Sequence, residues 1–276
     1  MRDHNYYPGN NKYILEEKIF DLNEARAHDA DTNKSSLLQR VSFESESLSV
    51  HFDFLENRLI EKILKADLIV GCVAWLTSFP ILDALAQKES SLIVQKEDFL
   101  RPDLGSVKNT WKYLLRKKYE ALKSVGRYFL PGWAGALSYC SDPHVGSIRC
   151  CGNRNSDKNP ASPRMHHKFA VFCKASFAGS LLAEGDAIYD PHSKNLLGYE
   201  TTVIEDDNPT EYTPYEVWTG SFNFTKNAGQ SLENAICLRD PSVVNAYVNE
   251  YCHILSLSEP LDWEYDWLAP EWRLGS

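Results

Sequence analysis

The sequence predicts an α/β protein in which a mixed central β-sheet is flanked by helices on both faces. Residues 68–75 form a continuous apolar run, as expected of a strand that is buried on both of its faces. A short helical stretch at 79–87 and a second apolar run at 91–95 follow, and together the three segments make a βαβ unit. The sheet gains further predicted strands at 146–151, 165–172, 216–219 and 235–238.

The segment before the βαβ unit divides into a polar extension and an amphipathic helix. Residues 1–46 are polar and are expected to form an N-terminal extension, in which 14–20 is a strand or a helical turn and 27–36 a loop. Partial alternation predicts a strand at 43–52. Residues 54–65 are expected to form a helix, because their apolar side chains recur at helical spacing: Leu55, Leu59, Ile60, Ile63 and Leu64.

Two predicted helices lie on either side of the second apolar run. Ser78 is placed to cap the helix at 79–87, and Pro80 suits its first turn. Residues 111–128 are expected to form a helix with a basic face and interleaved aromatic side chains. Such a face could bind a phosphate backbone, or it could be solvated surface with its aromatic residues in the core. The substrate-binding candidates on it are Arg116, Lys117 and Lys118.

The second half of the chain contains a long segment between two groups of predicted strands. Residues 174–215 are expected to add a hairpin or a lid, because structureless loops of this length are uncommon. A helical turn at 226–232 and a helix at 241–257, which begins with proline, complete a central domain that spans 47–257. Residues 258–276 form an aromatic tail that is expected to dock on the core or on a partner.

The composition is that of an ordinary soluble globular protein. The 276 residues are 43% hydrophobic and 24% charged, and no apolar run approaches the roughly 20 residues that cross a bilayer. The polar N-terminus lacks the apolar core of a secretory signal, so a cytoplasmic location is expected. A net charge of −9 argues against a protein that coats nucleic acid over its whole surface. It does not exclude a local basic groove. Seven scattered cysteines suit a reducing compartment.

A histidine–lysine pattern stands directly before the predicted strand that ends at Phe172. If His166, His167 and Lys168 are extended, His166 and Lys168 share one face while His167 points to the other. An ammonium group beside an imidazole favours the neutral imidazole, and this leaves a ring nitrogen able to attack an electrophile. The alternative interpretation is a surface strand edge that happens to carry these residues.

A second polar pattern occupies residues 220–225. Ser221, Asn223 and Thr225 alternate with phenylalanine, so they would present two hydroxyls and an amide in one direction. Those groups suit phosphate oxygens, and Gly220 would let the backbone approach a ligand closely. The alternative interpretation is a simple turn.

Paired in this order, the two patterns resemble the phospholipase D superfamily over roughly residues 146–240. The resemblance implies a phospholipase D-like fold with a long insertion between the motif halves. It also implies metal-independent phosphodiester transfer through a covalent phosphohistidine, with no cofactor. His166 would attack phosphorus, and Lys168 and Asn223 would stabilise the charge on the phosphoryl oxygens. Glu233 would orient the imidazole. The residues that carry the resemblance are His166, Lys168, Gly220, Ser221, Asn223, Thr225 and Glu233.

Two features separate this chain from the usual family pattern. Only one motif is present, and single-motif members resemble half-enzymes that pair into a homodimer, with two copies of His166 across one cleft. Strand alternation argues against His167 as the second histidine, because it points away. The family usually has aspartate five residues after the motif lysine, where this chain has Cys173. A thiol does not supply the charge of a carboxylate.

The superfamily includes nucleases, phospholipases and phosphatidyl transferases, so the substrate must be inferred from other features. Three features favour a nuclease that cleaves DNA or RNA: the single motif, the lack of a membrane-binding amphipathic segment, and the basic helix. In the superfamily that the sequence resembles, one motif per chain is typical of endonucleases, so endonucleolytic cleavage is expected. The alternatives are an enzyme that acts on lipid headgroups and a degenerate, non-catalytic binding module, for which Cys173 is the supporting feature. A place in a bacterial defence assembly is a further hypothesis that would accommodate the acidic charge.

One competing metal cluster can be drawn from the sequence. Its members are Cys140, His144, Cys150 and Cys151, and their spacing fits no standard zinc pattern well. No metal is therefore predicted.

Overall fold

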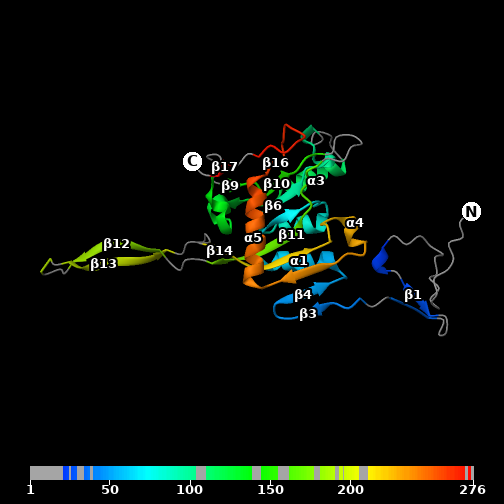
Figure 1. Cartoon of the computed structure of the whole chain (residues 1–276). Helices are drawn as coiled ribbons and strands as arrows, with labels where there is room; N and C mark the ends of the chain where they lie inside the picture. Colours follow the sequence, from blue (N-terminus) through cyan, green and yellow to red (C-terminus); the bar gives the residue numbers. More distant parts are fainter. Residues whose placement is uncertain are drawn as a thin grey trace, which may run out of the picture.

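The computed structural model describes residues 21–24, 26–29, 34–37, 40–103, 110–138, 144–154, 162–176, 181–189, 193–194, 196–204, 211–270 and 273–274. Nine strands form one mixed sheet (Figure 1): β3 (Phe43–Glu44), β4 (Leu48–His51), β5 (Leu68–Val73), β6 (Glu89–Gln95), β10 (Ile148–Cys151), β11 (Lys168–Ser176), β14 (Glu211–Gly220), β15 (Ala235–Leu238) and β16 (Glu259–Pro260). Their spatial order is β16-β10-β6-β5-β11-β14-β15-β4-β3.

The sheet is parallel on one side of its centre and antiparallel on the other. Strands β5, β6 and β10 are parallel neighbours, whereas β11 runs antiparallel to both β5 and β14. The register pairs Lys168 with Val73 and Phe169 with Thr219. The start of β11 therefore lies beside the C-terminal ends of β5 and β14, where both polar sequence patterns are located.

Helices cover both faces of this sheet, as the sequence predicts. Three of them lie on one face: α1 (Leu55–Lys65), α2 (Phe79–Leu85) and α3 (Trp111–Glu120). Helix α5 (Pro241–Ser256) crosses the other face, in front of the sheet in Figure 1. Two apolar clusters result, because alternate residues of the central strands point to opposite faces: Ala170 and Phe172 join the first cluster, and Phe169 and Val171 join the second. The predicted α/β class is confirmed.

Several short elements lie outside the main sheet. Four strand pairs stand apart from it: β1 (Arg26–Asp29) with β2 (Lys34–Leu37), β7 (Val125–Gly126) with β9 (His144–Val145), β8 (Leu137–Ser138) with β17 (Arg273–Leu274), and β12 (Leu181–Tyr189) with β13 (Leu196–Ile204). The described residues also contain short helical segments: α4 (Lys226–Gly229) and the 3-10 helices Leu22–Glu24, Asp98–Leu100, Arg127–Phe129 and Gly132–Ala136.

The structure confirms most predicted elements and corrects others. The hairpin of β12 and β13 confirms one of the two alternatives for residues 174–215, although β11 and β14 also extend into this segment. The predicted loop at 27–36 is wrong, because its described residues belong to β1 and β2. The predicted strand at 43–52 is two strands, since Ser45 turns the chain by hydrogen bonding to Leu48. The segment 14–20 lies outside the described residues.

The helix predicted over 111–128 is wrong beyond Glu120. Val125 pairs with Val145 in β7–β9 and is fully buried, so the chain is extended where helical spacing predicted another turn. The basic face is consequently shorter than expected. Ser78 caps α2 as predicted, because its hydroxyl accepts a hydrogen bond from the backbone N–H of Ile81.

The C-terminal tail is anchored on the sheet by a buried ion pair. The Lys96 side chain is fully buried, and its Nζ donates to Glu259 Oε1 at 2.6 Å and to the carbonyl oxygens of Tyr265 and Trp267 at 2.9 Å each. Strand β16 forms the edge beside β10, and Trp263 packs in the core. Residues 258–270 are thus part of the same folded body as the sheet.

In the part of the chain that the structure describes, no helix combines the length and the apolar character needed to cross a membrane. The six described cysteines are buried and free.

Candidate active site

The ends of two parallel strands bring the first side chains of the site together. Trp75 follows β5 and Glu97 follows β6, and these strands are parallel neighbours, so both residues emerge at the same edge of the sheet. The indole Nε1 of Trp75 donates to Glu97 Oε1 at 2.9 Å, and the guanidinium of Arg164 donates to the same oxygen. The ring of His166 meets the ring of Trp75 edge to face, with centroids 5.8 Å apart.

The second polar pattern lies beside this edge because it pairs with the chain after β5. The backbone N–H of Phe224 donates to the carbonyl of Trp75 at 3.1 Å, and Phe224 forms a parallel bridge with Leu76. Phe222 and Phe224 are buried in the core, whereas Asn223 between them faces a pocket. The predicted alternation is confirmed, and residues separated by about half the chain share one site.

His166 and Lys168 lie on the same side of the chain, as predicted. Lys168 Nζ is 3.3 Å from His166 Nδ1 and donates to the His166 carbonyl oxygen at 3.2 Å. Partial burial, followed by the positive charges of Lys168 and Arg164, lowers the pKa of His166 below its ordinary value. The imidazole is therefore neutral at physiological pH, which is the form a nucleophile needs.

His167 points to the opposite face of the sheet. Its Nε2 lies 3.2 Å from Glu250 Oε1 on α5, and its ring meets Phe169 edge to face. The predicted separation of the two adjacent histidines is confirmed.

Glu233 is connected to both halves of the motif in an unexpected way. The hydroxyl of Ser221 donates to its carboxylate and accepts from the backbone N–H of Asn234 at 3.1 Å. Burial lowers the pKa of Lys168, and the charge of Glu233 opposes this shift, so the two residues are electrostatic neighbours. Within the described residues of the single chain, Glu233 is hydrogen bonded to Ser221 rather than to His166. The role of Glu233 in orienting the imidazole stays a prediction.

Two residues of the second pattern have structural roles. Gly220 adopts φ +153°, and a Cβ there would lie 2.2 Å from the carbonyl oxygen of Asn234. A glycine is needed here because the neighbouring strand approaches closely, and the expectation that Gly220 lets the backbone approach a ligand stays a prediction. The hydroxyl of Thr225 accepts from the N–H of Ala228 at 3.1 Å and so caps α4, although Thr225 also lines the pocket.

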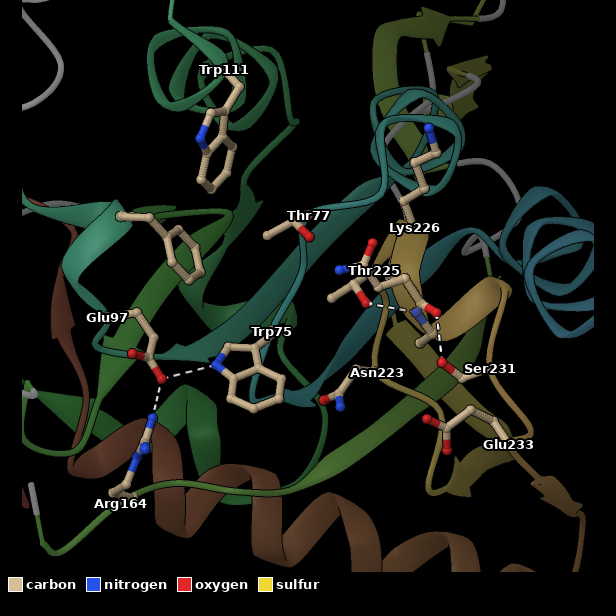
Figure 2. A pocket seen from close by; sticks show the side chains of 13 residues that line it. Trp75, Thr77, Glu97, Trp111, Arg164, Asn223, Thr225, Lys226, Ser231 and Glu233 are labelled. Atoms are coloured by element: carbon tan, nitrogen blue, oxygen red, sulfur yellow. Dashed lines mark hydrogen bonds and ion pairs between the residues drawn. The ribbon is translucent and has the colours of Figure 1, made fainter. Parts of the chain in front are cut away.

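Figure 2 shows the pocket, whose volume is about 810 Å³. One side carries aromatic rings, from Trp75, Phe99 and Trp111. The other side carries polar and charged groups, among them Asn223, Thr225, Lys226, Asn227, Ser231 and Glu233. Asn223 Oδ1 is buried and makes no hydrogen bond within the described structure. A buried amide without a partner is expected to be satisfied by water or a ligand.

His166 borders a second pocket, of about 520 Å³, on the α5 side. His167, Glu250 and His253 line it with apolar residues, and Arg164 borders both pockets. His166 lines the smaller pocket and not the larger one, but its ring contacts Trp75, which lines the larger one.

The three basic candidates of α3 do not line either of these pockets. Arg116 Nη1 lies 3.2 Å from Asp262 Oδ1, and ion pairs join Lys117 to Glu120 and Lys118 to Asp83. Lys117 and Lys118 therefore fit the interpretation of a solvated helix face, whereas Arg116 is largely buried and donates to the carbonyl oxygens of Leu100 and Leu261. Of the side chains named on this helix, Trp111 at its first position reaches the larger pocket.

The cysteines do not form a metal site among the described residues. Cys150 and Cys151 are adjacent on β10 and belong to apolar clusters on opposite faces of the sheet, so they cannot share a small ligand sphere. His144 lies in β9, and Cys140 lies outside the described residues. Cys173 is fully buried in the α5-side cluster, and burial raises the pKa of its thiol to about 12. It therefore acts as an apolar side chain.

Sequence reasoning missed three residues of the site: Trp75, Glu97 and Arg164. A signal for the first two was present, because Trp75 is the last residue of one predicted strand of the βαβ unit and Glu97 comes two residues after the other. The carboxyl ends of parallel strands meet at one edge of a sheet, and ligands commonly bind there. Arg164 carries no such signal, since its position depends on the path of a loop.

No protein-family model matches the chain. The chain is 30% identical over 226 residues to the uncharacterized protein L381 of Acanthamoeba polyphaga mimivirus, and the alignment covers 79% of this chain and 68% of the viral protein. The similar solved structures include Nuc of Salmonella typhimurium, described as a phospholipase D family member (13% identity, TM-score 0.39, 77% of this chain and 96% of Nuc).

Two more solved structures are similar at the same level. NucT of Helicobacter pylori is 14% identical with a TM-score of 0.40, over 77% of this chain and 98% of NucT. The phosphatidylserine synthase of Haemophilus influenzae Rd KW20 is 14% identical with a TM-score of 0.34, over 82% of this chain and 42% of the synthase. Likeness of this degree does not carry an activity from one protein to another.

Proposed function

The chain belongs to the same family as the mimivirus protein L381, and from the chemistry of its site we propose that it is a phosphodiesterase of the phospholipase D type. The observation that carries the proposal is the pair of His166 and Lys168, with Nζ 3.3 Å from Nδ1 and a lowered imidazole pKa. The same pair begins the sequence pattern that resembles this superfamily. A neutral imidazole beside a cation suits attack on a negatively charged phosphodiester.

In the proposed reaction His166 attacks phosphorus and forms a phosphohistidine, while the ester oxygen leaves with a proton from a second imidazole. Water activated by that imidazole then hydrolyses the phosphohistidine. Lys168 and the side-chain amide of Asn223 stabilise the charge that develops on the phosphoryl oxygens. Asn223 is suited to this role because its side chain lines the pocket and its amide nitrogen can donate to an anionic oxygen.

The second imidazole is proposed to come from a second copy of the chain. His167 also lines the smaller pocket, but its Nε2 is paired with Glu250 on α5, so we do not assign it this role. His253 borders the smaller pocket together with His166 and is the alternative source within one chain. A homodimer with two copies of His166 across one cleft would supply both histidines from a single gene product.

A nucleic acid is the proposed substrate, and endonucleolytic cleavage the proposed mode. Lys226 supplies positive charge at the larger pocket, where the charge of Arg164 is balanced by Glu97, and the aromatic side of the pocket suits nucleobases. Two of the similar structures, Nuc and NucT, support this proposal only at the level of the fold. A lipid phosphodiester is the alternative substrate. A place in a defence assembly remains a hypothesis with no structural argument behind it.

The test is digestion of single- and double-stranded DNA and RNA by EDTA-treated protein, beside its His166→Ala variant. The wild type is expected to cleave at least one of these substrates without added metal, and the variant is expected to lose cleavage. His167→Ala is the matched control, because it removes the adjacent imidazole that faces α5. Absence of cleavage by the wild type, or equal cleavage by His166→Ala, would refute the nuclease. Release of headgroups from phospholipid micelles would support the lipid alternative.

A further inference from the structure

Three rings line one side of the larger pocket and are called the aromatic wall here: Trp75, Phe99 and Trp111. Figure 2 shows Trp75 and Trp111 projecting into the same hollow from different segments of the chain. Trp75 follows β5, whereas Trp111 opens α3, where Thr110 caps the helix by accepting from the N–H of Tyr113 at 3.2 Å. The cap fixes the residue at which the helix begins and therefore places Trp111 at the pocket.

The two indoles differ in how firmly they are held. Trp75 is fixed on both sides, by its hydrogen bond to Glu97 and by the edge of the His166 ring. Trp111 is 52% exposed and touches Phe99 at a tilted angle, with centroids 5.5 Å apart. A large apolar ring left this exposed at the rim of a pocket indicates a binding surface rather than a packing role. One indole is thus preorganised and the other can adjust to a ligand.

We propose that an unpaired nucleobase occupies the space between Trp75 and Trp111, so that the substrate is a single-stranded nucleic acid. This inference rests on the proposed function and names its substrate class. Every base has a π face that stacks on aromatic side chains, whereas a base inside a duplex is already stacked on its neighbours. Thr77 and Asn227 border the same pocket and can hydrogen bond to the edge of the base.

The position of Trp75 links this pocket to the reaction. Its ring lies against His166 and its backbone carbonyl binds Phe224, the neighbour of Asn223. A base stacked on Trp75 would therefore place its own phosphate beside the nucleophile and the amide. The volume of about 810 Å³ falls within the usual range of ligand pockets, roughly 300–1,000 Å³, and can hold a nucleoside.

A choline headgroup is the other ligand that aromatic rings commonly bind. The charge distribution disfavours it. The carboxylate of Glu97 is already paired with Arg164 and hydrogen bonded by Trp75, so no free carboxylate lies at the aromatic wall. Glu233, the other carboxylate of the pocket, lies on the polar side and is hydrogen bonded by Ser221. Amides and hydroxyls, which suit a base edge, make up much of the remaining lining.

The test measures binding in a His166→Ala background, so that it does not depend on turnover. The probes are short fluorescein-labelled single strands of DNA and RNA, the same strands annealed to complements, and single strands with one abasic position. Trp111→Ala is expected to weaken binding of the better single strand about tenfold or more, because a stacked base is worth roughly 1–3 kcal/mol. Tyr128→Ala is the matched control, since this exposed ring lies at a different pocket.

The abasic strand supplies the decisive comparison. It is expected to bind the parent protein more weakly than the intact strand does, and Trp111→Ala should weaken it little further, because the stacking partner is already gone. Equal binding of single strands by the parent and by Trp111→Ala would overturn the proposal. So would binding of phosphatidylcholine vesicles that is lost in Trp111→Ala while oligonucleotide binding is unchanged.

The outcomes also separate this inference from the proposed function. If the protein cleaves nucleic acid but Trp111→Ala binds single strands normally, the base site is wrong and the nuclease stands. If the protein cleaves nothing but binds single strands through Trp111, the catalytic proposal fails and the base site stands. Trp111→Phe, which keeps an aromatic face, should restore most of the binding and so excludes misfolding as the cause of a loss.

Discussion

Lys168 Nζ lies 3.3 Å from the Nδ1 atom of His166 and also donates to the backbone carbonyl of the same residue. One ammonium group therefore fixes the local backbone and sets the charge next to the ring. Because the pKa of His166 is lowered by burial and then by Lys168 and Arg164, its neutral form persists to pH values below 6.5.

The first prediction concerns the pH dependence of the reaction. Activity requires neutral His166, so kcat/KM should fall only as the pH drops through a pKa below 6.5. In Lys168→Met this acid limb should move to higher pH, because one cation is removed; the shift is partial, since burial remains the larger cause. The rate should also drop by roughly 10²–10³-fold. The measurement is the pH profile of kcat/KM.

Lys174→Met is the control for this experiment, since Lys174 lies on the same strand but pairs with Asp67. Its profile should match the wild type. An acid limb that stays in place in Lys168→Met would contradict the electrostatic role of Lys168.

The second prediction concerns the segment before the main sheet, which binds the loop that carries Glu233. Arg40 Nη2 donates to the Glu233 carbonyl at 3.2 Å and Nη1 donates to Asn23 Oδ1 at 2.6 Å. Asn23 Nδ2 in turn donates to the carbonyls of Gly229 and Ser231. Arg40→Gln should lower kcat about tenfold to 10²-fold through misplacement of Glu233, with KM nearly unchanged.

Arg40→Lys keeps the positive charge and one donor, so its kcat should lie between those of Arg40→Gln and the wild type. A general loss of folding would not produce this order. Arg58→Gln is the matched control, because Arg58 pairs with Asp53 at the surface. A normal kcat in Arg40→Gln, or a loss explained by a lower unfolding midpoint, would rule out the positioning role.

The third prediction concerns Cys173, which stands where the sequence pattern that this chain resembles usually has aspartate. The thiol is fully buried in the apolar cluster under α5, and burial raises its pKa to about 12. Cys173→Asp should destabilise the fold by about 3 kcal/mol or more in urea titration at neutral pH, because it buries an unpaired carboxylate. Burial would raise the pKa of that carboxyl above its usual value of about 4, so the loss should shrink as the pH falls toward 4.

Cys173→Val should cost less than about 1.5 kcal/mol, since it keeps an apolar side chain of similar volume. Full stability of Cys173→Asp at neutral pH would mean that the site holds a partner for the charge after all.

The fourth prediction concerns the source of the second histidine. Light scattering at micromolar concentration should give twice the chain mass of 31.4 kDa. His253→Ala should then keep most of the activity, because in the proposed homodimer the partner copy of His166 protonates the leaving oxygen. A strict monomer whose activity disappears in His253→Ala would assign the second imidazole to α5 instead.

The sequence by itself determined everything that depends on local pattern. Strand alternation separated His166 from His167 and placed Asn223 between two buried phenylalanines, because neighbouring side chains of an extended chain point to opposite faces. Continuous apolar runs identified β5 and β6, since a strand buried on both faces does not alternate.

Only the tertiary structure decided what depends on pairing between distant segments. The end of the helix at Glu120 follows from the pairing of Val125 with Val145, which overrides local helical spacing. The bonds that join Trp75, Glu97 and Arg164 connect residues from three separate segments. Gly220 turned out to serve a close approach to Asn234. Such contacts form between segments that are far apart in the sequence. The short-range periodicity of the sequence does not show which of these segments will be neighbours in the fold.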